Sequence, residues 1–393
     1  MRKGWEYKKL GEVCTIKAGY TPPKDELFDN GAYPYYKVAD MNTLGNDVYL
    51  DITSSYKIDA NKLFPKGAIV FPKNGAAVST NKKRILKYDS IVDLNTGVAI
   101  FQKSINEKFA YYWFIDTDFK KYVRGGALPT LDIKSLKDKP FPSIEKSTQL
   151  AIVSELDKIN ELIRLKKEQL KDFDNLAQSI FYEMFGDPVE NEKGWEVKKL
   201  GEISSLICNG NTPKGGSEVY VDNGILFLRS QNVWKNRLDL DDVAFIDEAT
   251  HKSLKKSALN HHDLLITKTG RVNTENSSLG RTALFEGEDG SANINGHVYL
   301  VRLKEGMVHK YVLYILISNS YRELIRRTCV GGIDKRQLNK NHIEDFPIIF
   351  PPLSLQRLFA QRIEQIEREK SEVQKSIQDL ETLLASRMQY WFE

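Results

Sequence analysis

Two stretches of the chain place apolar residues alternately three and four positions apart. The first lies within residues 147–186 and the second within 354–393. This spacing puts the apolar side chains on one face of a helix and is typical of the a and d positions of a coiled coil. A shift of 207 residues, as from Ile152 to Phe359, superimposes the two patterns. The pattern therefore predicts two equivalent long helices that pair with each other.

Short runs of β-branched and aromatic residues precede each predicted long helix. Gly, Asn and Pro separate these runs, which predicts strands joined by substantial loops. In each module one further stretch has aromatic or apolar residues at helical spacing. We expect strands at 33–38, 68–71, 91–94, 225–229, 264–268 and 298–303, and helices at 111–123 and 311–327.

The second half of the chain repeats the first. The residues Gly-Trp-Glu followed by Lys-Lys-Leu-Gly-Glu occur within 4–12 and again within 194–202, which is 190 positions later. A repeat of about half the chain predicts two similar modules with similar tasks. The expected segments are 1–146, 147–186, 187–353 and 354–393, in the order module, helix, module, helix. The predicted fold class is α+β, with two α/β modules separated by two long antiparallel coiled-coil helices in a pseudo-two-fold tandem repeat.

Charge and composition narrow the range of functions. The net charge is only +4, but residues 1–147 carry 24 Lys and Arg against 17 Asp and Glu, a difference of +7. A basic module permits nucleic-acid binding without requiring it. Three scattered cysteines suit a reducing compartment, and no signal peptide or membrane-spanning stretch is evident, so we expect a cytoplasmic protein.

The sequence offers no catalytic or metal-binding constellation. It contains neither the G-x-x-x-x-G-K-[ST] phosphate loop nor the G-x-G-x-x-G dinucleotide turn. His261-His262-Asp263 is the one conspicuous cluster, but adjacent histidines on a strand or helix should point apart, so no metal site is expected. These absences favour a recognition component over an enzyme.

Four features recur in the same order in both copies of the repeat. Each copy has the W-x-x-K-K-L-G-E opening, a Gly/Thr/Pro loop, a strand ending in polar residues, and a proline-containing exit followed by Gln at the start of the helix. The first copy lacks the double proline of the second. The segments concerned are 5–12, 18–22, 35–41, 139–142 with Gln149, and 195–202, 209–213, 224–233, 346–353 with Gln356. With these features the sequence resembles the specificity subunits of type I restriction–modification enzymes along essentially its whole length.

The resemblance implies a non-catalytic subunit that binds DNA. Each module would be a target recognition domain for one half of a bipartite, asymmetric double-stranded DNA site. The helices would act as a spacer and as the dock for two methyltransferase subunits, which would carry the S-adenosylmethionine; restriction subunits could join them. This chain itself would need no cofactor. The helix residues expected to bind partners are Ile163, Lys166, Leu170, Lys370, Val373 and Ile377.

Two of these helix residues, Lys166 and Lys370, interrupt the apolar seams. Each could extend along its helix so that the ammonium reaches solvent. Alternatively, each could set the register or orientation of partner helices, as a lone polar residue in a seam can.

Candidate DNA contacts follow from the chemistry of base and phosphate recognition. Arg and Lys pair with guanine, Asn and Gln pair with adenine, and most other basic contacts go to phosphate. Polar residues that follow apolar strands, and basic loops, are therefore the candidates. They are Tyr20, Lys37, Lys73, Asn74, Lys82, Lys83 and Arg84 in the first module, and Arg229, Gln231, Asn232, Lys268, Arg271, Lys335 and Arg336 in the second.

Two other hypotheses remain open on the sequence alone. The chain could be the recognition part of an enzyme with a fused catalytic domain, although no methylase motif is present. It could also be a structural coiled-coil protein without DNA specificity. The duplicated Gly/Thr/Pro loops and polar strand ends argue against that, because a spacer protein would not need them.

Overall fold

The computed structural model describes residues 2, 4–59, 62–126, 129–272, 274, 276–332 and 335–392. The chain forms two compact units. The first comprises Met1–Lys167 together with Lys375–Glu393, and the second comprises Glu168–Gln374. Each unit holds one of the predicted modules together with one part of each predicted long helix.

The structure confirms the two long helices that the apolar pattern predicts. Helix α4 spans Lys146–Phe185 and helix α10 spans Leu353–Phe392, each with 40 residues. At 1.5 Å per residue each is about 60 Å long. Each begins one residue before its predicted segment.

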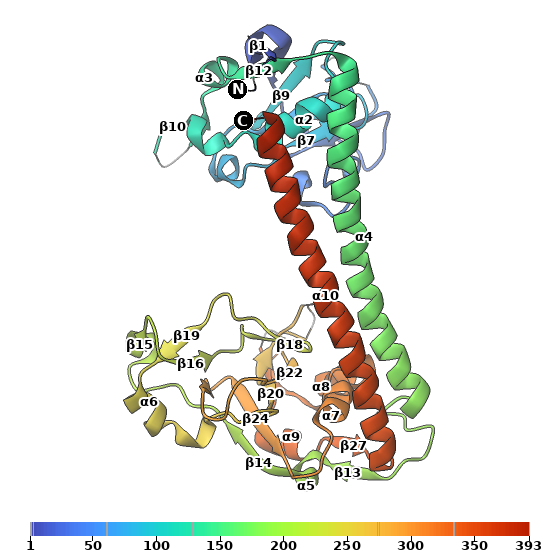
Figure 1. Ribbon diagram of the computed structural model, residues 1–393, viewed down its shortest axis with the longest axis vertical. Coiled ribbons are helices and arrows are strands. Elements are labelled where there is room, and N and C mark those ends of the chain that lie inside the picture. The colour runs from blue at the N-terminus through green and yellow to red at the C-terminus, as the bar shows by residue number, and fades with distance from the viewer. Residues whose placement is uncertain are drawn as a thin grey trace. The chain divides into compact units, whose positions relative to one another are not determined.

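Side-chain contacts within each unit show that the two helices pack antiparallel (Figure 1). In the first unit Arg387 of α10 pairs with Glu155 of α4, and Lys167 Nζ lies 2.7 Å from the Glu381 carboxylate. In the second unit Lys370 of α10 pairs with Asp174 of α4. As the residue number rises along one helix, its partner's number falls along the other.

The first unit has a five-stranded sheet in the order β2-β9-β6-β7-β4 and a three-stranded sheet in the order β5-β3-β8. Helix α2 packs on this module with its aromatic residues buried. The elements are β1 Glu6–Lys9, α1 Leu10–Val13, β2 Cys14–Ala18, β3 Tyr33–Tyr36, β4 Tyr49–Leu50, β5 Tyr56–Lys57, β6 Ile69–Pro72, β7 Arg84–Leu86, β8 Ile91–Val92, β9 Thr96–Phe101, α2 Glu107–Asp116, β10 Val123–Arg124, β11 Thr130–Leu131, α3 Ile133–Lys137 and β12 Pro140–Ser143.

The second unit has two four-stranded sheets, β14-β24-β20-β22 and β15-β19-β16-β23, and a small sheet, β21-β26-β25. Its elements are β13 Val197–Lys199, α5 Leu200–Ile203, β14 Ser204–Asn209, β15 Tyr220–Val221, β16 Ile225–Leu228, β17 Val233–Trp234, β18 Arg237–Leu238, β19 Ala244–Ile246, α6 Glu248–Ser253, β20 Leu264–Thr267, β21 Thr269–Gly270, β22 Thr282–Leu284, β23 Ala292–Ile294, β24 Val298–Leu303, α7 His309–Leu316, α8 Asn319–Thr328, β25 Val330–Gly331, β26 Arg336–Gln337, α9 Lys340–Glu344 and β27 Pro347–Ile349.

The sequence repeat is also a repeat of strand pairing. In the first unit β9 pairs antiparallel with β2 and β6, and β3 pairs parallel with β8. In the second unit β24 pairs antiparallel with β14 and β20, and β16 pairs parallel with β23. The prediction of a tandem repeat of mixed modules is therefore confirmed.

The repeated Lys-Leu-Gly-Glu motif forms one helical turn in each unit. The Glu12 carboxylate accepts a hydrogen bond from the Lys9 backbone N–H at 2.9 Å, and Glu202 does the same for Lys199 at 2.7 Å. Each motif leucine, Leu10 for example, is fully buried in its module. The motif is thus a structural capping turn, which explains why both copies need it.

Two predicted helices have different bounds. Helix α2 ends at Asp116, and a separate 3-10 turn at Phe119–Tyr122 follows it, so residues 111–123 are not one helix. Residues 311–327 form two helices, α7 and α8, because the chain turns at Ser318. The Ser318 hydroxyl accepts from the Tyr321 backbone N–H at 3.3 Å and so caps α8.

Candidate nucleic-acid interface

Several strand ends of the first unit meet at one edge of its sheets. Strands β2 and β6 both run antiparallel to β9, so they end where β9 begins. Strand β3 runs parallel to β8, and residues 93–95 connect the end of β8 to the start of β9. The predicted contacts Tyr20, Lys37, Lys73 and Asn74 all follow strands that end at this edge. We refer to these residues and residues 93–95 as the strand-end edge of the first unit.

Hydrogen bonds hold the loops of this edge together. The Lys73 backbone N–H donates to the Asn95 carbonyl at 2.8 Å, and the Tyr20 N–H donates to the Val92 carbonyl at 2.9 Å. At Gly19 a Cβ atom would lie 2.1 Å from the Asp93 carbonyl oxygen, so only glycine fits. The Gly/Thr/Pro loop therefore needs its glycine for close backbone approach.

The second unit has the same edge. Strands β14 and β20 end where β24 begins, and the Lys268 N–H donates to the His297 carbonyl at 2.8 Å. At Gly210 a Cβ atom would lie 2.3 Å from the Ile294 carbonyl oxygen. The predicted contacts Arg229 and Lys268 follow the ends of β16 and β20, and with residues 295–297 they form the strand-end edge of the second unit.

Backbone hydrogen bonds identify equivalent residues on the two edges. The Lys73 carbonyl accepts from the Leu131 N–H at 2.9 Å, and the Lys268 carbonyl accepts from the Leu338 N–H at 2.9 Å. Lys73 and Lys268 are therefore structural counterparts. Lys37 corresponds to Arg229 in the same way. Lys37 directly follows β3 and Arg229 directly follows β16. The carbonyl of the last residue of β3 accepts a backbone hydrogen bond from the loop after β8, and that of β16 accepts one from the loop after β23.

A small sheet gathers further basic candidates in the second unit. Strand β26 pairs with both β21 and β25, which places Arg336 opposite Gly270. Arg271 follows β21, and Lys335 precedes β26; both side chains are exposed. The structure thus brings together two basic segments that lie about 65 positions apart in the sequence.

Lys83 corrects the sequence prediction. It is fully buried, and its ammonium donates to the Thr117 carbonyl at the end of α2 at 2.8 Å and lies 4.1 Å from the Phe119 ring centroid. Burial lowers the pKa of Lys83 to about 7. A buried lysine that caps a helix end cannot reach a phosphate, so Lys83 is removed from the candidate interface.

The neighbours of Lys83 are also engaged within the protein. The Arg84 guanidinium donates to the carbonyls of Met41 at 2.8 Å and Lys83 at 2.7 Å, which ties two loops together. Lys82 is half-buried, and its ammonium contacts the Asn42 side chain. Arg84 is therefore a structural residue, while Lys82 retains partial exposure.

We predict that Lys83 makes the stability of the first unit depend on pH. Between pH 7 and 10.5 the unfolded chain binds a proton that the folded lysine gives up, so stability should rise with pH by up to about 1.4 kcal/mol per unit. Urea unfolding at pH 8 and 9.5 should show this slope in the native chain and a flatter one in Lys83→Met. Lys82→Met is the control and should keep the native slope. Identical slopes in the native chain and Lys83→Met would contradict the prediction.

Asn232 also proves structural. It is only 2% exposed, and its amide donates to the carbonyls of Asp239 at 3.0 Å and Asp242 at 2.7 Å. Its side-chain oxygen accepts from the Arg229 backbone N–H at 2.9 Å. Asn232 thus shapes the loop that carries Arg229 and Gln231, and it is not free to pair with adenine.

Sequence reasoning missed an aromatic–arginine pair beside these loops. The Arg281 guanidinium lies 3.7 Å from the Trp234 ring centroid, and its Nε donates to the Ser277 carbonyl at 3.0 Å. Both residues line an open hollow of about 500 Å³ that Gln231 and Arg271 also line. Neither Trp234 nor Arg281 belongs to a repeated motif, so the sequence held no signal for them.

The prediction that the adjacent histidines His261 and His262 point apart is wrong. His262 has a positive φ of 68°, and in this turn the His261 and His262 ring centroids lie only 3.8 Å apart instead of pointing away from each other. The His309 ring lies tilted against His262, with the ring centroids 5.1 Å apart. Burial, with the neighbouring histidines, lowers the pKa of His309 to about 4. Among the residues that the structure describes, no group of three or more His, Cys, Asp and Glu has an arrangement suited to a metal ion.

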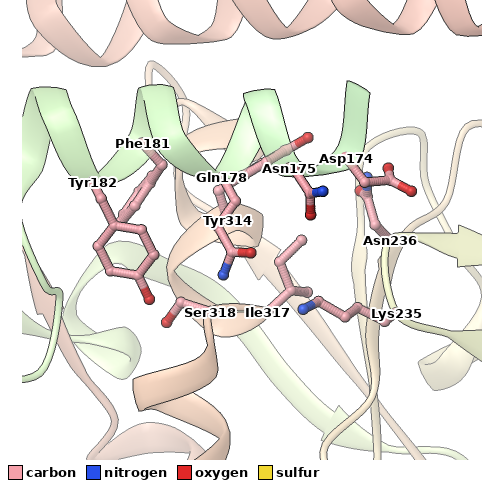
Figure 2. Close-up of a pocket in the computed structure, with 10 residues that line it drawn as sticks. All are labelled: Asp174, Asn175, Gln178, Phe181, Tyr182, Lys235, Asn236, Tyr314, Ile317 and Ser318. Carbon is pink, nitrogen blue, oxygen red and sulfur yellow. The ribbon is translucent and has the colours of Figure 1, made fainter. Parts of the chain in front are cut away.

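A cavity of about 260 Å³ lies between α4 and the second module (Figure 2). Figure 2 shows side chains of α4 on one side and, on the other, Lys235 and Asn236 from the turn between β17 and β18 and residues at the end of α7. Asp174 in this cavity pairs with Lys370. None of the predicted DNA contacts lines the cavity, so it is separate from the strand-end edge.

The predicted partner-binding residues of the helices lie mostly inside the chain. Ile163, Val373 and Ile377 are buried, and Lys166 and Leu170 are half-buried. The Lys370 ammonium pairs with Asp174 of the same chain, so this seam lysine links the chain's own helices. Buried seam residues stabilise the helix pair and do not present a surface to a partner. The outward-facing apolar residues on these helices include Leu162, Leu165, Leu176 and Leu383.

No helix in the described parts of the chain is long and apolar enough to cross a membrane.

The structure is thus a tandem pair of mixed modules with basic residues at their strand-end edges, combined with a pair of long antiparallel helices. Residues 2–172 and 192–382 match the family described as the type I restriction modification DNA specificity domain. The chain belongs to this family, as a type I restriction–modification specificity subunit with two DNA recognition domains.

Relatives along nearly the whole chain carry the same description. The type I restriction enzyme MjaIX specificity subunit of Methanocaldococcus jannaschii is 25% identical over 401 residues, covering 91% of this chain and 85% of that protein. The StySPI specificity subunit of Salmonella potsdam is 19% identical and covers 98% of this chain and 87% of that protein.

Solved structures share the fold. The S subunit of the type I restriction–modification system from M. genitalium has a TM-score of 0.53 at 15% identity, covering 99% of this chain and 96% of that one. A chain from a study of complex assembly and conformational transition in the type I system has a TM-score of 0.61 at 18% identity, covering 100% and 98%.

Proposed function

We propose that each unit binds one half of a split, asymmetric double-stranded DNA site through its strand-end edge. The observation that carries this proposal is the duplicated edge, in which Lys73 and Lys268 occupy equivalent positions with the same backbone hydrogen bonds. A lysine at the same place in both units suits a contact that both need, which is phosphate binding.

The differences between the two edges support an asymmetric site. Lys37 corresponds to Arg229, and the residue after the loop glycine is Tyr20 in one unit and Asn211 in the other. Arg forms paired hydrogen bonds to guanine, whereas Lys offers a single point charge. Two edges with different donors should select different half-sites.

We further propose that α4 and α10 dock two methyltransferase subunits. Leu176 and Leu383 are related by the same 207-residue shift as the apolar seams, and each is nearly half exposed, at 47% and 46%. Two equivalent outward leucines suit two copies of one partner. In this proposal the methyltransferase holds the S-adenosylmethionine and performs the chemistry, this chain is not catalytic, and restriction subunits join the same assembly.

The test is to coexpress the chain with its neighbouring methyltransferase subunit and map methylated bases across the host genome. The expected result is one split, asymmetric motif with a constant gap that is lost when this chain is deleted. Methylation that persists unchanged after the deletion would contradict the proposal.

In the purified complex, Lys73→Ala and Lys268→Ala should each weaken DNA binding for all sequences alike. Each loss of a phosphate contact should reduce the slope of log affinity against log salt by about 1. Lys9→Ala and Lys199→Ala are matched controls, because these lysines are also equivalent but precede β2 and β14 and pair with Asp138 and Asp345. An unchanged slope in the Lys73 and Lys268 variants would place the phosphate contacts elsewhere.

A further inference from the structure

Two predicted DNA contacts of the second unit share one carboxylate. Arg229 Nη2 lies 3.1 Å from Oδ1 of Asp242, and Gln231 Nε2 donates to the other oxygen, Oδ2, at 2.8 Å. Both oxygens of Asp242 are therefore engaged by donors from the loop that follows β16. The Asp242 side chain is nevertheless 79% exposed.

The loop backbone holds this arrangement independently of the carboxylate. Asn232 donates to the Asp242 carbonyl at 2.7 Å, and Arg229 Nη2 donates to the same carbonyl at 2.8 Å. The Asp239 backbone N–H donates to the Asn232 carbonyl at 2.8 Å. Changing only the Asp242 side chain therefore leaves the bonds that shape the loop in place.

The bonds between Arg229 and Asp242 determine which N–H groups of Arg229 remain available to bind DNA. Guanidinium has five N–H groups in a planar fork, and the bonds to Asp242 use Nη2. The Arg229 side chain is only 21% exposed, so its orientation is restricted. Without the carboxylate, the Nη2 bond to the Asp242 backbone carbonyl remains, but the guanidinium can turn about that bond, so that its outer N–H groups can reach a nearby phosphate.

The negative charge has a second consequence. Asp242 is exposed beside the donors of Arg229 and Gln231, so a DNA phosphate that approaches them meets a like charge. A neutral base edge, such as the O6 and N7 acceptors of guanine, meets no such repulsion. The same carboxylate thus favours base contacts over phosphate contacts.

We propose that Asp242 is a positioning residue for recognition of the second half-site. It orients Arg229 and Gln231 toward base edges and discourages them from binding phosphate. This inference rests on the proposed function, in which these two residues lie at the DNA interface.

The test measures DNA binding by the purified complex with methyltransferase subunits. It compares Asp242→Asn with the native chain on cognate DNA and on DNA with an altered second half-site. The variant should bind cognate DNA about two- to five-fold more weakly, because an exposed ion pair of this kind contributes little more than that. It should bind the altered DNA more tightly, with a steeper salt dependence, because freed donors reach phosphate.

Asp239→Asn is the matched control, since Asp239 lies on the same loop but its carboxylate accepts from the Asp241 backbone N–H at 3.2 Å. This control should strengthen binding to both DNAs alike, as removal of any nearby negative charge would. The proposal is overturned if Asp242→Asn strengthens both as well, or leaves both unchanged. Loss of cognate binding alone would also overturn it, because that would make Asp242 itself a base contact.

Arg229→Ala separates failure of this inference from failure of the proposed function. If Arg229→Ala keeps full discrimination at the second half-site, the interface assignment is wrong. If it loses discrimination while Asp242→Asn does not show opposite shifts, only the positioning role fails. Methylation that still depends on the first half-site shows in either case that the complex is intact.

Discussion

The variants Leu176→Glu and Leu383→Glu should each lose one docked methyltransferase subunit, while the chain stays folded. Both side chains are nearly half exposed on the long helices and face away from the buried seam. A leucine at the centre of a helix interface contributes about 2 kcal/mol or more, so its loss should weaken each docking site about 30-fold. At protein concentrations near the dissociation constant of the native complex, the double variant should therefore bind neither copy.

Stoichiometry can be read by light scattering or native mass spectrometry of the purified complex. Leu162→Glu is a matched control, because Leu162 is 48% exposed but its counterpart on α10 is Glu369. A site used twice by one partner should not depend on a position that already carries a glutamate in one copy. Thermal unfolding should give the same midpoint for all four variants, the double variant included.

An intact complex with two bound copies in the double variant would show that the partners dock elsewhere. A charge at Ile163 or Val373 is not an equivalent test of docking. Both residues are buried, so a charge there would destabilise the helix pair itself. Loss of the complex would then say nothing about docking.

The large-scale organisation could be predicted because it rests on periodic patterns. Apolar residues, Ile152 and Phe359 among them, repeat at coiled-coil spacing along most of each 40-residue helix, and such a helix buries the same face along its length. The duplicated motifs fold into duplicated capping turns and loops. The strand-end edges could be predicted because polar residues, Lys73 and Lys268 among them, directly follow apolar strands.

Individual side chains could not be placed from the same patterns. In the sequence Lys82-Lys83-Arg84 looks like a solvated basic loop, but Lys83 and Arg84 donate to backbone carbonyls of distant segments. Asn232 looks like a base-reading residue, yet it satisfies the backbone of its own loop. Such roles depend on which carbonyl lies within 3 Å, and residues far apart in sequence decide that.

Local backbone conformation caused the remaining differences. The adjacent rings of His261 and His262 result from one positive φ angle, which neither strand nor helix periodicity anticipates. The break between α7 and α8 depends on Ser318, whose hydroxyl competes with the helix for a backbone N–H. Apolar residues at helical spacing on both sides of Ser318 hid that break.

Lengthening both long helices by one heptad should lengthen the gap between the two half-sites by about three base pairs. Duplicating residues 161–167 in α4 and 368–374 in α10 adds seven residues to each helix, or about 10.5 Å. One base pair occupies about 3.4 Å along the duplex. Seven residues preserve the apolar seam, because they complete two turns of a coiled coil. Both helices must be extended, since they pack antiparallel and a single insertion would shift one seam past the other.

Methylome mapping of cells that express the lengthened chain with its methyltransferase subunit would measure the gap directly. The half-sites themselves should stay the same, because the strand-end edges are untouched. A five-residue insertion in both helices is the control: at about 100° per residue it rotates the seam by roughly 140° and should abolish assembly. If the seven-residue variant still methylates the native gap, the helices do not measure the distance between half-sites. In that case the DNA or the methyltransferase subunits set it, and only the recognition role of the two units would stand.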